Sequence, residues 1–149
     1  MLKTFATICI IGMFTSSCTS KKASRTEGSH EAEQDLTMIV GTYTSGDSKG
    51  LYSFRFNEEN GTATALSEAE VENPSYLVPS ADGKFIYAVS EFSNEQAAAN
   101  AFAFNKEEGT FRLLNTQKTG GEDPCYIITN GSNVVTANYS GGSISVFPI

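Results

Sequence analysis

The side chains best suited to chemistry in this sequence occupy three positions that recur at a fixed interval. The three pairs are Thr42 and Tyr43, Ser90 and Glu91, and Asn138 and Tyr139. Glu91 is the only carboxylate among them, so it is the best candidate for a general base or for an acceptor of a ligand hydroxyl. Asn138 could donate hydrogen bonds to a ligand oxygen. Tyr43 and Tyr139 could form the walls of a pocket, although each of these residues alone could equally shape a turn.

Other reactive side chains are placed less favourably. His30, the only histidine, lies in a polar segment without apolar periodicity, which argues against a catalytic or ligand role. Cys125 follows Pro124 and has no histidine in the folded part to activate it, so we expect a small buried core residue. No cluster has the spacing of a metal site, and neither a metal nor a cofactor is expected. Arg55 and Arg112 alternate with apolar neighbours and are expected to face solvent.

An internal repeat of about 48 residues must position the candidate side chains. The repeated features are a strand-like segment with equivalents Gly41, Val89 and Ala137, an Asn-x-x-x-Gly-Thr turn at 57–62 and 105–110, and an Asx-Pro-x-Tyr segment at 73–77 and 123–127. The first two features recur every 48 residues and the third recurs after 50. Three separate features that recur at nearly the same interval indicate a repeat architecture.

Each repeat contains segments with the alternation of β-strands, separated by Gly-containing turns. Residues 51–56 place aromatic side chains on one face, and residues 101–104 and 144–147 begin the same pattern. Four strands in a repeat of about 48 residues predict an all-β fold built of four-stranded antiparallel β-propeller blades. A β-solenoid has shorter coils, and a β-sandwich does not need turns on a fixed period. We expect the segments that precede Thr42, Ser90 and Asn138 to be the innermost strands of their blades.

The N-terminal residues have the pattern of an export signal. Lys3 provides a positive charge, residues 5–14 form a short apolar segment, and Thr-Ser-Ser-Cys at 15–18 resembles a lipoprotein cleavage site. We therefore expect residues 1–18 to be a lipoprotein-type signal peptide that ends at the lipidated Cys18. Ordinary secretory cleavage is the alternative. The pattern predicts an exported bacterial protein, periplasmic or anchored to the outer membrane, that meets the membrane only through its lipid.

The rest of the sequence divides into a tether and a folded part. Residues 19–35 are polar and aperiodic, which is typical of a disordered linker. Residues 36–149 contain two repeats and the start of a third. Because a propeller needs at least four blades to close, we expect a partial propeller whose missing blades come from the rest of a longer protein. The net charge of −7 argues against a nucleic-acid partner, since phosphate neutralisation requires a basic surface.

Several short segments carry a further signal. They are Gly-Thr-Tyr-Thr at 41–44 with Gly-Leu-Tyr at 50–52, Asn-Pro-Ser-Tyr-Leu at 73–77, and Ala-Asn-Tyr-Ser-Gly-Gly-Ser at 137–143 with Val-Phe-Pro at 146–148. In this order and spacing they resemble the beginning of the bacterial lactonase family, which includes 6-phosphogluconolactonases. The resemblance covers residues 38–149 and implies a seven-bladed propeller. It also implies hydrolysis of a sugar lactone, such as 6-phosphogluconolactone, to the aldonic acid at one mouth of the central channel, without a metal or cofactor.

The resemblance suggests roles for the candidate residues. Glu91 would be the base, Asn138 would donate to a lactone oxygen, and Tyr43 and Tyr139 would contact the substrate. Tyr126 is a further predicted substrate contact, and it is also a departure, because many members of the family carry histidine there. Since tyrosine supplies no imidazole, this position does not support a mechanism that depends on histidine.

Three functions stay open at this point. The first is a lactonase of carbohydrate metabolism, for which an unphosphorylated lactone is an alternative substrate because the phosphorylated one is cytosolic and this chain carries an export signal. The second is a non-catalytic exported propeller that acts as a binding module, since propellers have many unrelated functions. The third is an inactive truncated fragment, because two blades and part of a third would leave an apolar face and an unpaired strand edge.

Overall fold

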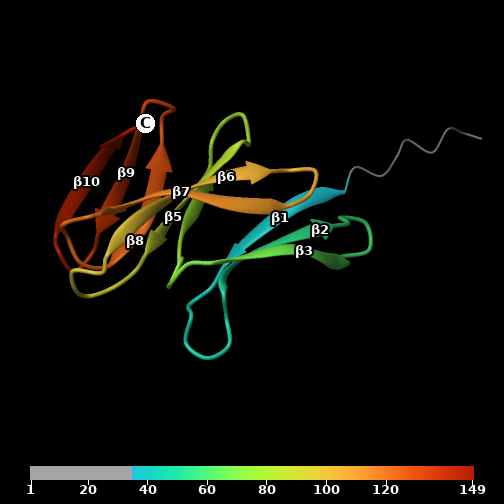
Figure 1. Ribbon diagram of the computed structural model, residues 1–149, viewed down its shortest axis with the longest axis horizontal. Helices are drawn as coiled ribbons and strands as arrows, with labels where there is room; N and C mark the ends of the chain where they lie inside the picture. Colours follow the sequence, from blue (N-terminus) through green and yellow to red (C-terminus); the bar gives the residue numbers. More distant parts are fainter. Residues whose placement is uncertain (1–34) are drawn as a thin grey trace, which may run out of the picture. The chain divides into compact units, whose positions relative to one another are not determined.

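The computed structural model describes residues 35–149, which form ten β-strands in three antiparallel sheets (Figure 1). The predicted signal peptide at 1–18, the lipidation site at Cys18 and all but the last residue of the tether at 19–35 lie outside the described residues. Within residues 35–149, no helix is long and apolar enough to cross a membrane. The predicted all-β fold class is confirmed.

Each sheet is built from strands that are consecutive in the sequence. The first contains β1 (Leu36–Gly41), β2 (Gly50–Phe56) and β3 (Ala63–Glu70); the second contains β4 (Leu77–Pro79), β5 (Phe85–Ser90), β6 (Ala98–Asn105) and β7 (Thr110–Lys118); the third contains β8 (Pro124–Thr129), β9 (Asn133–Asn138) and β10 (Ser143–Pro148). Neighbouring strands pair in chain order throughout the three sheets. The second sheet is therefore the predicted four-stranded antiparallel blade.

The repeated Asn-x-x-x-Gly-Thr segments form the same hairpin turn twice. The Gly61 N–H donates to the Asn57 carbonyl at 2.9 Å, and the Gly109 N–H donates to the Asn105 carbonyl at 2.7 Å. Both glycines have positive φ, 73° and 72°, a conformation that glycine adopts without a steric penalty. The prediction of hairpins at these segments is confirmed.

The prediction that the repeated strand is innermost is wrong for β5 and β9, each of which lies between two neighbours, whereas β1 does lie at the edge of its sheet. Strand β5 lies between β4 and β6, so it is an interior strand of its sheet, and β4 occupies the edge. Only three residues of β4 pair with β5, too few to show alternation in the sequence. The last of them is Pro79, whose missing N–H is compatible with an edge strand.

Strand β5 packs against both neighbouring sheets. Ile86 and Ala88 belong to a buried cluster with residues of the first sheet, whereas Tyr87 and Val89 belong to a second cluster with residues of the third sheet. Successive side chains of a strand point to opposite faces, so both faces of β5 are covered. This double burial explains why residues 86–89 form an uninterrupted apolar run.

Two expectations about single residues are also wrong. Cys125 is exposed rather than buried, because a bulge between Pro124 and Tyr126 interrupts the pairing of β8 at the edge of its sheet. Arg55 is half-buried and donates from Nη2 to the Glu107 carbonyl at 2.8 Å, so it links the first two sheets instead of facing solvent. Arg112 is exposed, as expected.

Candidate functional site

One end of the sheets gathers most of the predicted site residues. The segments that follow β5 and β9 lie beside the segments that precede β4 and β8. The Glu91 N–H donates to the Asn73 carbonyl at 3.1 Å, and the Tyr139 N–H donates to the Asp123 carbonyl at 2.8 Å. We call this end of the sheets the loop end.

Asn73 and Asp123 hold the loop end together in the same way. Both have positive φ, 48° and 51°, which Asn and Asp tolerate better than other residues with side chains. The Thr44 hydroxyl donates to Asn73 Oδ1 at 3.0 Å, and the Ser93 hydroxyl donates to Asp123 Oδ1 at 2.7 Å. Each Asx residue therefore fastens the loop of one sheet to the first strand of the next, and we call the two contacts Asx latches.

Tyr43 and Glu91 are brought together at the loop end. The Tyr43 hydroxyl donates to Glu91 Oε2 at 2.9 Å. This hydrogen bond is the main reason that the pKa of Tyr43 is raised above its usual value, with further contributions from burial and from the charge of Glu91. Among residues 35–149, Glu91 Oε1 accepts no hydrogen bond, so it can accept one from a ligand. Tyr43 thus orients the carboxylate through Oε2, while Oε1 is available to a ligand.

Ser75 adjoins this pair and was missed in the sequence. Its Oγ atom is buried and makes no hydrogen bond of normal geometry within the described residues. The hydroxyl is still near enough to Tyr43 to lower the pKa of that phenol, against the larger effect of Glu91. The available signal was the repeat itself, because Ser75 lies in the Asx-Pro-x-Tyr segment that precedes β4.

Tyr126 contacts a residue that sequence analysis did not single out as part of a site. The rings of Tyr76 and Tyr126 have centroids 4.8 Å apart and planes inclined by 53°. Their relative exposures are 42% and 41%, so neither ring is covered by the other. The two tyrosines are repeat equivalents, and that equivalence could have indicated a pair. We call them the tyrosine pair.

Asn138 does not join these groups. It is only 2% exposed, and its amide nitrogen donates to Ser143 Oγ at 3.1 Å and to Ser145 Oγ at 2.9 Å. Its Oδ1 accepts from the Thr136 hydroxyl at 3.0 Å. The predicted donation to a ligand would require these bonds to break, so the geometry favours a structural role. Tyr139, by contrast, is 81% exposed and open to contact.

The loop end carries negative charge. Asp123 lies close enough to raise the pKa of Tyr43, and its own pKa is lowered by hydrogen bonds from Ser140 and Ser93. Within the part of the chain that the structure describes, no group of three His, Cys, Asp or Glu side chains could hold a metal ion. The arrangement can therefore accept protons and hydrogen bonds, and it presents aromatic surface beside them.

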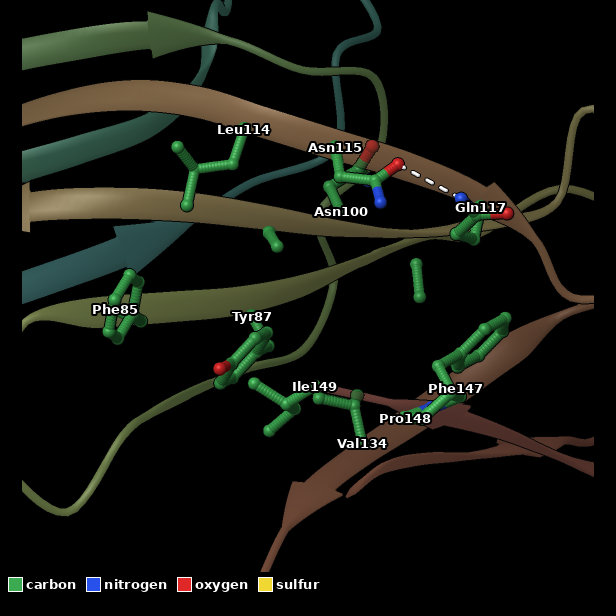
Figure 2. A pocket seen from close by; sticks show the side chains of 12 residues that line it. Phe85, Tyr87, Asn100, Leu114, Asn115, Gln117, Val134, Phe147, Pro148 and Ile149 are labelled. Atoms are coloured by element: carbon green, nitrogen blue, oxygen red, sulfur yellow. Dashed lines mark hydrogen bonds between the residues drawn. The ribbon is translucent and has the colours of Figure 1, made fainter. Parts of the chain in front are cut away.

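A cleft of about 260 Å³ elsewhere in the fold contains none of the predicted site residues (Figure 2). It is lined mainly by apolar side chains of the second and third sheets, including Phe85, Leu114 and Phe147. Its polar groups include Gln117, which donates to Asn115 Oδ1 at 3.1 Å. Among the side chains of residues 35–149 that line the cleft, Tyr87 is the only titratable one, so these side chains supply neither a carboxylate nor an imidazole for acid–base chemistry.

Comparison with known proteins adds independent information. A sequence model of the family described as "Lactonase, 7-bladed beta-propeller" matches residues 37–149. A 6-phosphogluconolactonase of Bacillus subtilis is 36% identical over 116 residues, which cover 74% of this chain and 32% of that protein. A 6-phosphogluconolactonase of Formosa agariphila is 34% identical over 119 residues, covering 75% and 33%. The chain thus spans about a third of the length of the curated relatives that it matches.

Solved structures show the same similarity. A proposed 6-phosphogluconolactonase of Bacteroides fragilis is 70% identical, with a TM-score of 0.78 over 80% of this chain and 33% of that one. A periplasmic gluconolactonase of Pseudomonas aeruginosa is 28% identical, with a TM-score of 0.70 over 76% of this chain and 34% of that one.

Proposed function

Because the chain belongs to the lactonase family of seven-bladed β-propellers, we propose that the protein hydrolyses a sugar lactone to the corresponding aldonic acid. The family assignment is supported by the match over residues 37–149 and by relatives that are 6-phosphogluconolactonases. The observation that carries the proposal for this chain is the Glu91 carboxylate, which is oriented by Tyr43 and has one oxygen open to a ligand.

In the proposed reaction Glu91 acts as the general base. Its carboxylate takes a proton from a water molecule, and the water oxygen bonds to the carbonyl carbon of the lactone. The bond between that carbon and the ring oxygen then breaks, and the ring oxygen leaves as a hydroxyl after taking up the proton. Tyr43 fixes the orientation of the carboxylate, since holding a base in place removes much of the entropic barrier. No described residue has to form a covalent intermediate.

The test is hydrolysis measured on the complete gene product. We expect acid release from glucono-δ-lactone in a pH-stat to exceed the spontaneous rate, and Glu91→Gln to lower kcat by about 10²- to 10⁴-fold, as for loss of a general base. The matched control is Glu95→Gln, an exposed carboxylate on the same loop, which should retain activity.

Two outcomes would count against the proposal in different ways. An active protein whose kcat is unchanged by Glu91→Gln would remove Glu91 from the mechanism. A protein that binds the lactone without hydrolysing it would instead support the binding-module function, which the tyrosine at position 126 also favours.

We propose in addition that the protein is exported and lipid-anchored through Cys18. The support is the sequence of residues 1–18, with its short apolar segment followed by Thr-Ser-Ser-Cys. Metabolic labelling with a fatty-acid analogue should tag the wild-type protein and not Cys18→Ser. Labelling of the variant at the wild-type level would contradict the anchor.

A further inference from the structure

The side chain of Asn73 contacts the residue next to Tyr43 and the backbone of Glu91 at the same time. Its Oδ1 atom accepts hydrogen bonds from the Thr44 N–H at 3.1 Å and from the Thr44 hydroxyl at 3.0 Å. Its amide nitrogen donates to the Glu91 carbonyl at 3.2 Å. One amide group therefore fastens the segment that carries Tyr43 to the segment that carries Glu91.

The backbone of Asn73 adds to this connection. Its carbonyl accepts from the Glu91 N–H at 3.1 Å and from the Ser75 N–H at 2.8 Å. The same residue thus holds Glu91 at both its N–H and its C=O. Since the Glu91 carboxylate is in turn bonded to Tyr43, three contacts fix the position of the proposed base, and two of them come from Asn73.

The backbone conformation of Asn73 also points to a special position. Its φ of 48° lies in the left-handed region, where a residue with a side chain is strained. Strain of this kind persists only where the surrounding contacts enforce it, and strained residues cluster at functional sites. Glycine would adopt the same φ without strain, so the backbone alone gives no reason for an asparagine side chain here.

The repeat equivalent of Asn73 makes fewer of these contacts. The Asp123 carbonyl accepts from the Tyr139 N–H at 2.8 Å, but an ionised carboxylate donates no hydrogen bond and cannot bind the Tyr139 carbonyl. Among residues 35–149, Glu91 and Tyr139 also form no hydrogen bond that would correspond to the one between Tyr43 and Glu91. The amide donor and the paired carboxylate thus occur at the same junction, whereas the other junction forms without either.

We propose that Asn73 is a positioning residue for the proposed base: its side-chain amide sets the position of Glu91 relative to Tyr43 and keeps the carboxylate aligned for proton transfer. The inference rests on the proposed lactonase function, because alignment affects the reaction only if Glu91 is the base. Positioning of this kind acts on kcat more than on binding, since a displacement of about 1 Å can slow a reaction by about 10²-fold.

Kinetics on the complete gene product test the effect on the reaction. Asn73→Asp keeps the size of the side chain and the acceptor for Thr44, and it removes the donor to the Glu91 carbonyl. Asn73→Gly removes the whole side chain, and glycine tolerates the positive φ. At pH 7 we expect each variant to lower kcat for glucono-δ-lactone by about 10- to 100-fold, with KM changed by less than about twofold.

The matched control is Asn105→Asp, the same substitution at the end of β6 that lies away from the loop end. The Asn105 side chain accepts hydrogen bonds from the backbone N–H groups of Glu107 and Glu108, and a carboxylate can accept both. This variant should keep the wild-type kcat and KM.

A spectroscopic measurement reports the position of Glu91 without relying on activity. In protein labelled with ¹³C at the tyrosine Cζ atoms, the Tyr43 resonance is the one that disappears in Tyr43→Phe. Glu91→Ala gives the position of this resonance when the hydrogen bond to Glu91 is absent. We expect Asn73→Asp and Asn73→Gly to move the resonance toward its Glu91→Ala position, and Asn105→Asp to leave it unchanged. Circular dichroism checks that each variant is folded, and if Asn73→Asp does not fold, Asn73→Gly decides.

The two measurements separate failure of this inference from failure of the proposed function. A displaced Tyr43 resonance in a protein that hydrolyses no lactone would overturn the enzymatic function and still confirm that Asn73 positions Glu91. A wild-type resonance and a wild-type kcat in folded Asn73→Gly would overturn the inference and leave the proposed function intact. A fall in kcat without displacement of the resonance would also overturn the inference, because the loss would not then come from the position of Glu91.

Discussion

The junction between the first and second sheets and the junction between the second and third sheets share a polar contact and differ in their cores. Both have an Asx latch at the loop end, with Asn73 in the first and Asp123 in the second. The buried cluster of the first junction contains Leu51, Phe102 and Phe104, whereas that of the second contains smaller aliphatic residues and Tyr87. The comparison teaches that a short polar contact can be repeated faithfully while the apolar packing beneath it varies.

The difference in the cores reflects the two-sided burial of the second sheet. Its strands contribute side chains to both clusters, and the large aromatic residues of β6 and β7 gather on the side of the first sheet. Phe104 and Phe111 have ring centroids 5.0 Å apart, and Phe102 meets Phe111 edge to face at 6.3 Å. Such aromatic contacts contribute beyond the area that they bury. The first junction should therefore be the more sensitive to truncation of a single side chain.

The largest expected effect comes from truncating one phenylalanine in each junction. Phe102 is 1% exposed in the first cluster, so Phe102→Ala should lower the free energy of unfolding by about 3–5 kcal/mol. Phe147 is only half-buried against the second cluster, so Phe147→Ala should cost about 1–2 kcal/mol. Urea unfolding followed by circular dichroism gives both values. Equal losses would show that the two junctions are energetically alike despite their different cores.

A second test uses the two copies of the hairpin turn. Alanine at Gly61 would meet no atom within 4 Å and would suffer only the positive φ, so we expect a loss of about 1–2 kcal/mol. Alanine at Gly109 would carry the same strain and would also approach Leu66 and the Ser53 hydroxyl to 2.7 Å. Overpacking of this kind adds about 1–3 kcal/mol. Thermal or urea unfolding of Gly61→Ala and Gly109→Ala measures the difference.

Gly61→Ala serves as the matched control for Gly109→Ala, because the two turns have the same sequence pattern and nearly the same φ. If both variants lose the same stability, the first junction accommodates an extra methyl group, and its packing is looser than the contact distances imply. A larger loss of stability for Gly61→Ala than for Gly109→Ala would contradict the expected overpacking at Gly109.

The repeat, the all-β class and the hairpins could be predicted because each depends on local spacing. Predictions from local sequence patterns failed where a strand's position or a residue's exposure depends on pairing between segments. The edge position of β4 could not be seen, since its three paired residues show no alternation, and the exposure of Cys125 follows from a bulge that leaves no mark in the sequence.

The candidate site was predictable in part for the same reason. Tyr43 and Glu91 are repeat equivalents 48 residues apart, and adjacent sheets bring equivalent loops together, so their hydrogen bond follows from the period. The position of Asn138 in the repeat was also correct, but its amide is used by Ser143 and Ser145 of the next strand. Only the register of β9 and β10 shows that these hydroxyls are within reach.

The smallest expected effect concerns the one chemical difference between the two Asx latches. The pKa of Asp123 is lowered, first by Ser140 and then by Ser93, so its charged form stabilises the fold. A carboxyl with a lowered folded-state pKa contributes stability above its unfolded pKa, about 3.9, and loses that contribution as the pH falls through the folded-state value. Asp123→Asn should therefore lower the unfolding midpoint at pH 7, and the gap to wild type should close in acid.

At the first latch a carboxylate should destabilise the fold, whereas at the second it stabilises the fold. The Asn73 amide nitrogen donates to the Glu91 carbonyl at 3.2 Å, and a carboxylate at this position would lose that donation and face the carbonyl oxygen. Asn73→Asp should thus destabilise the protein at pH 7 and recover as the new carboxyl is protonated in acid. Measuring the unfolding midpoint of both variants between pH 3 and 7 sharpens the comparison, since each variant controls for the other. If the gap between Asp123→Asn and wild type does not close in acid, the charge at Asp123 is not what distinguishes the second junction, and its hydroxyl contacts with Ser93 and Ser140 act as they would for a neutral amide.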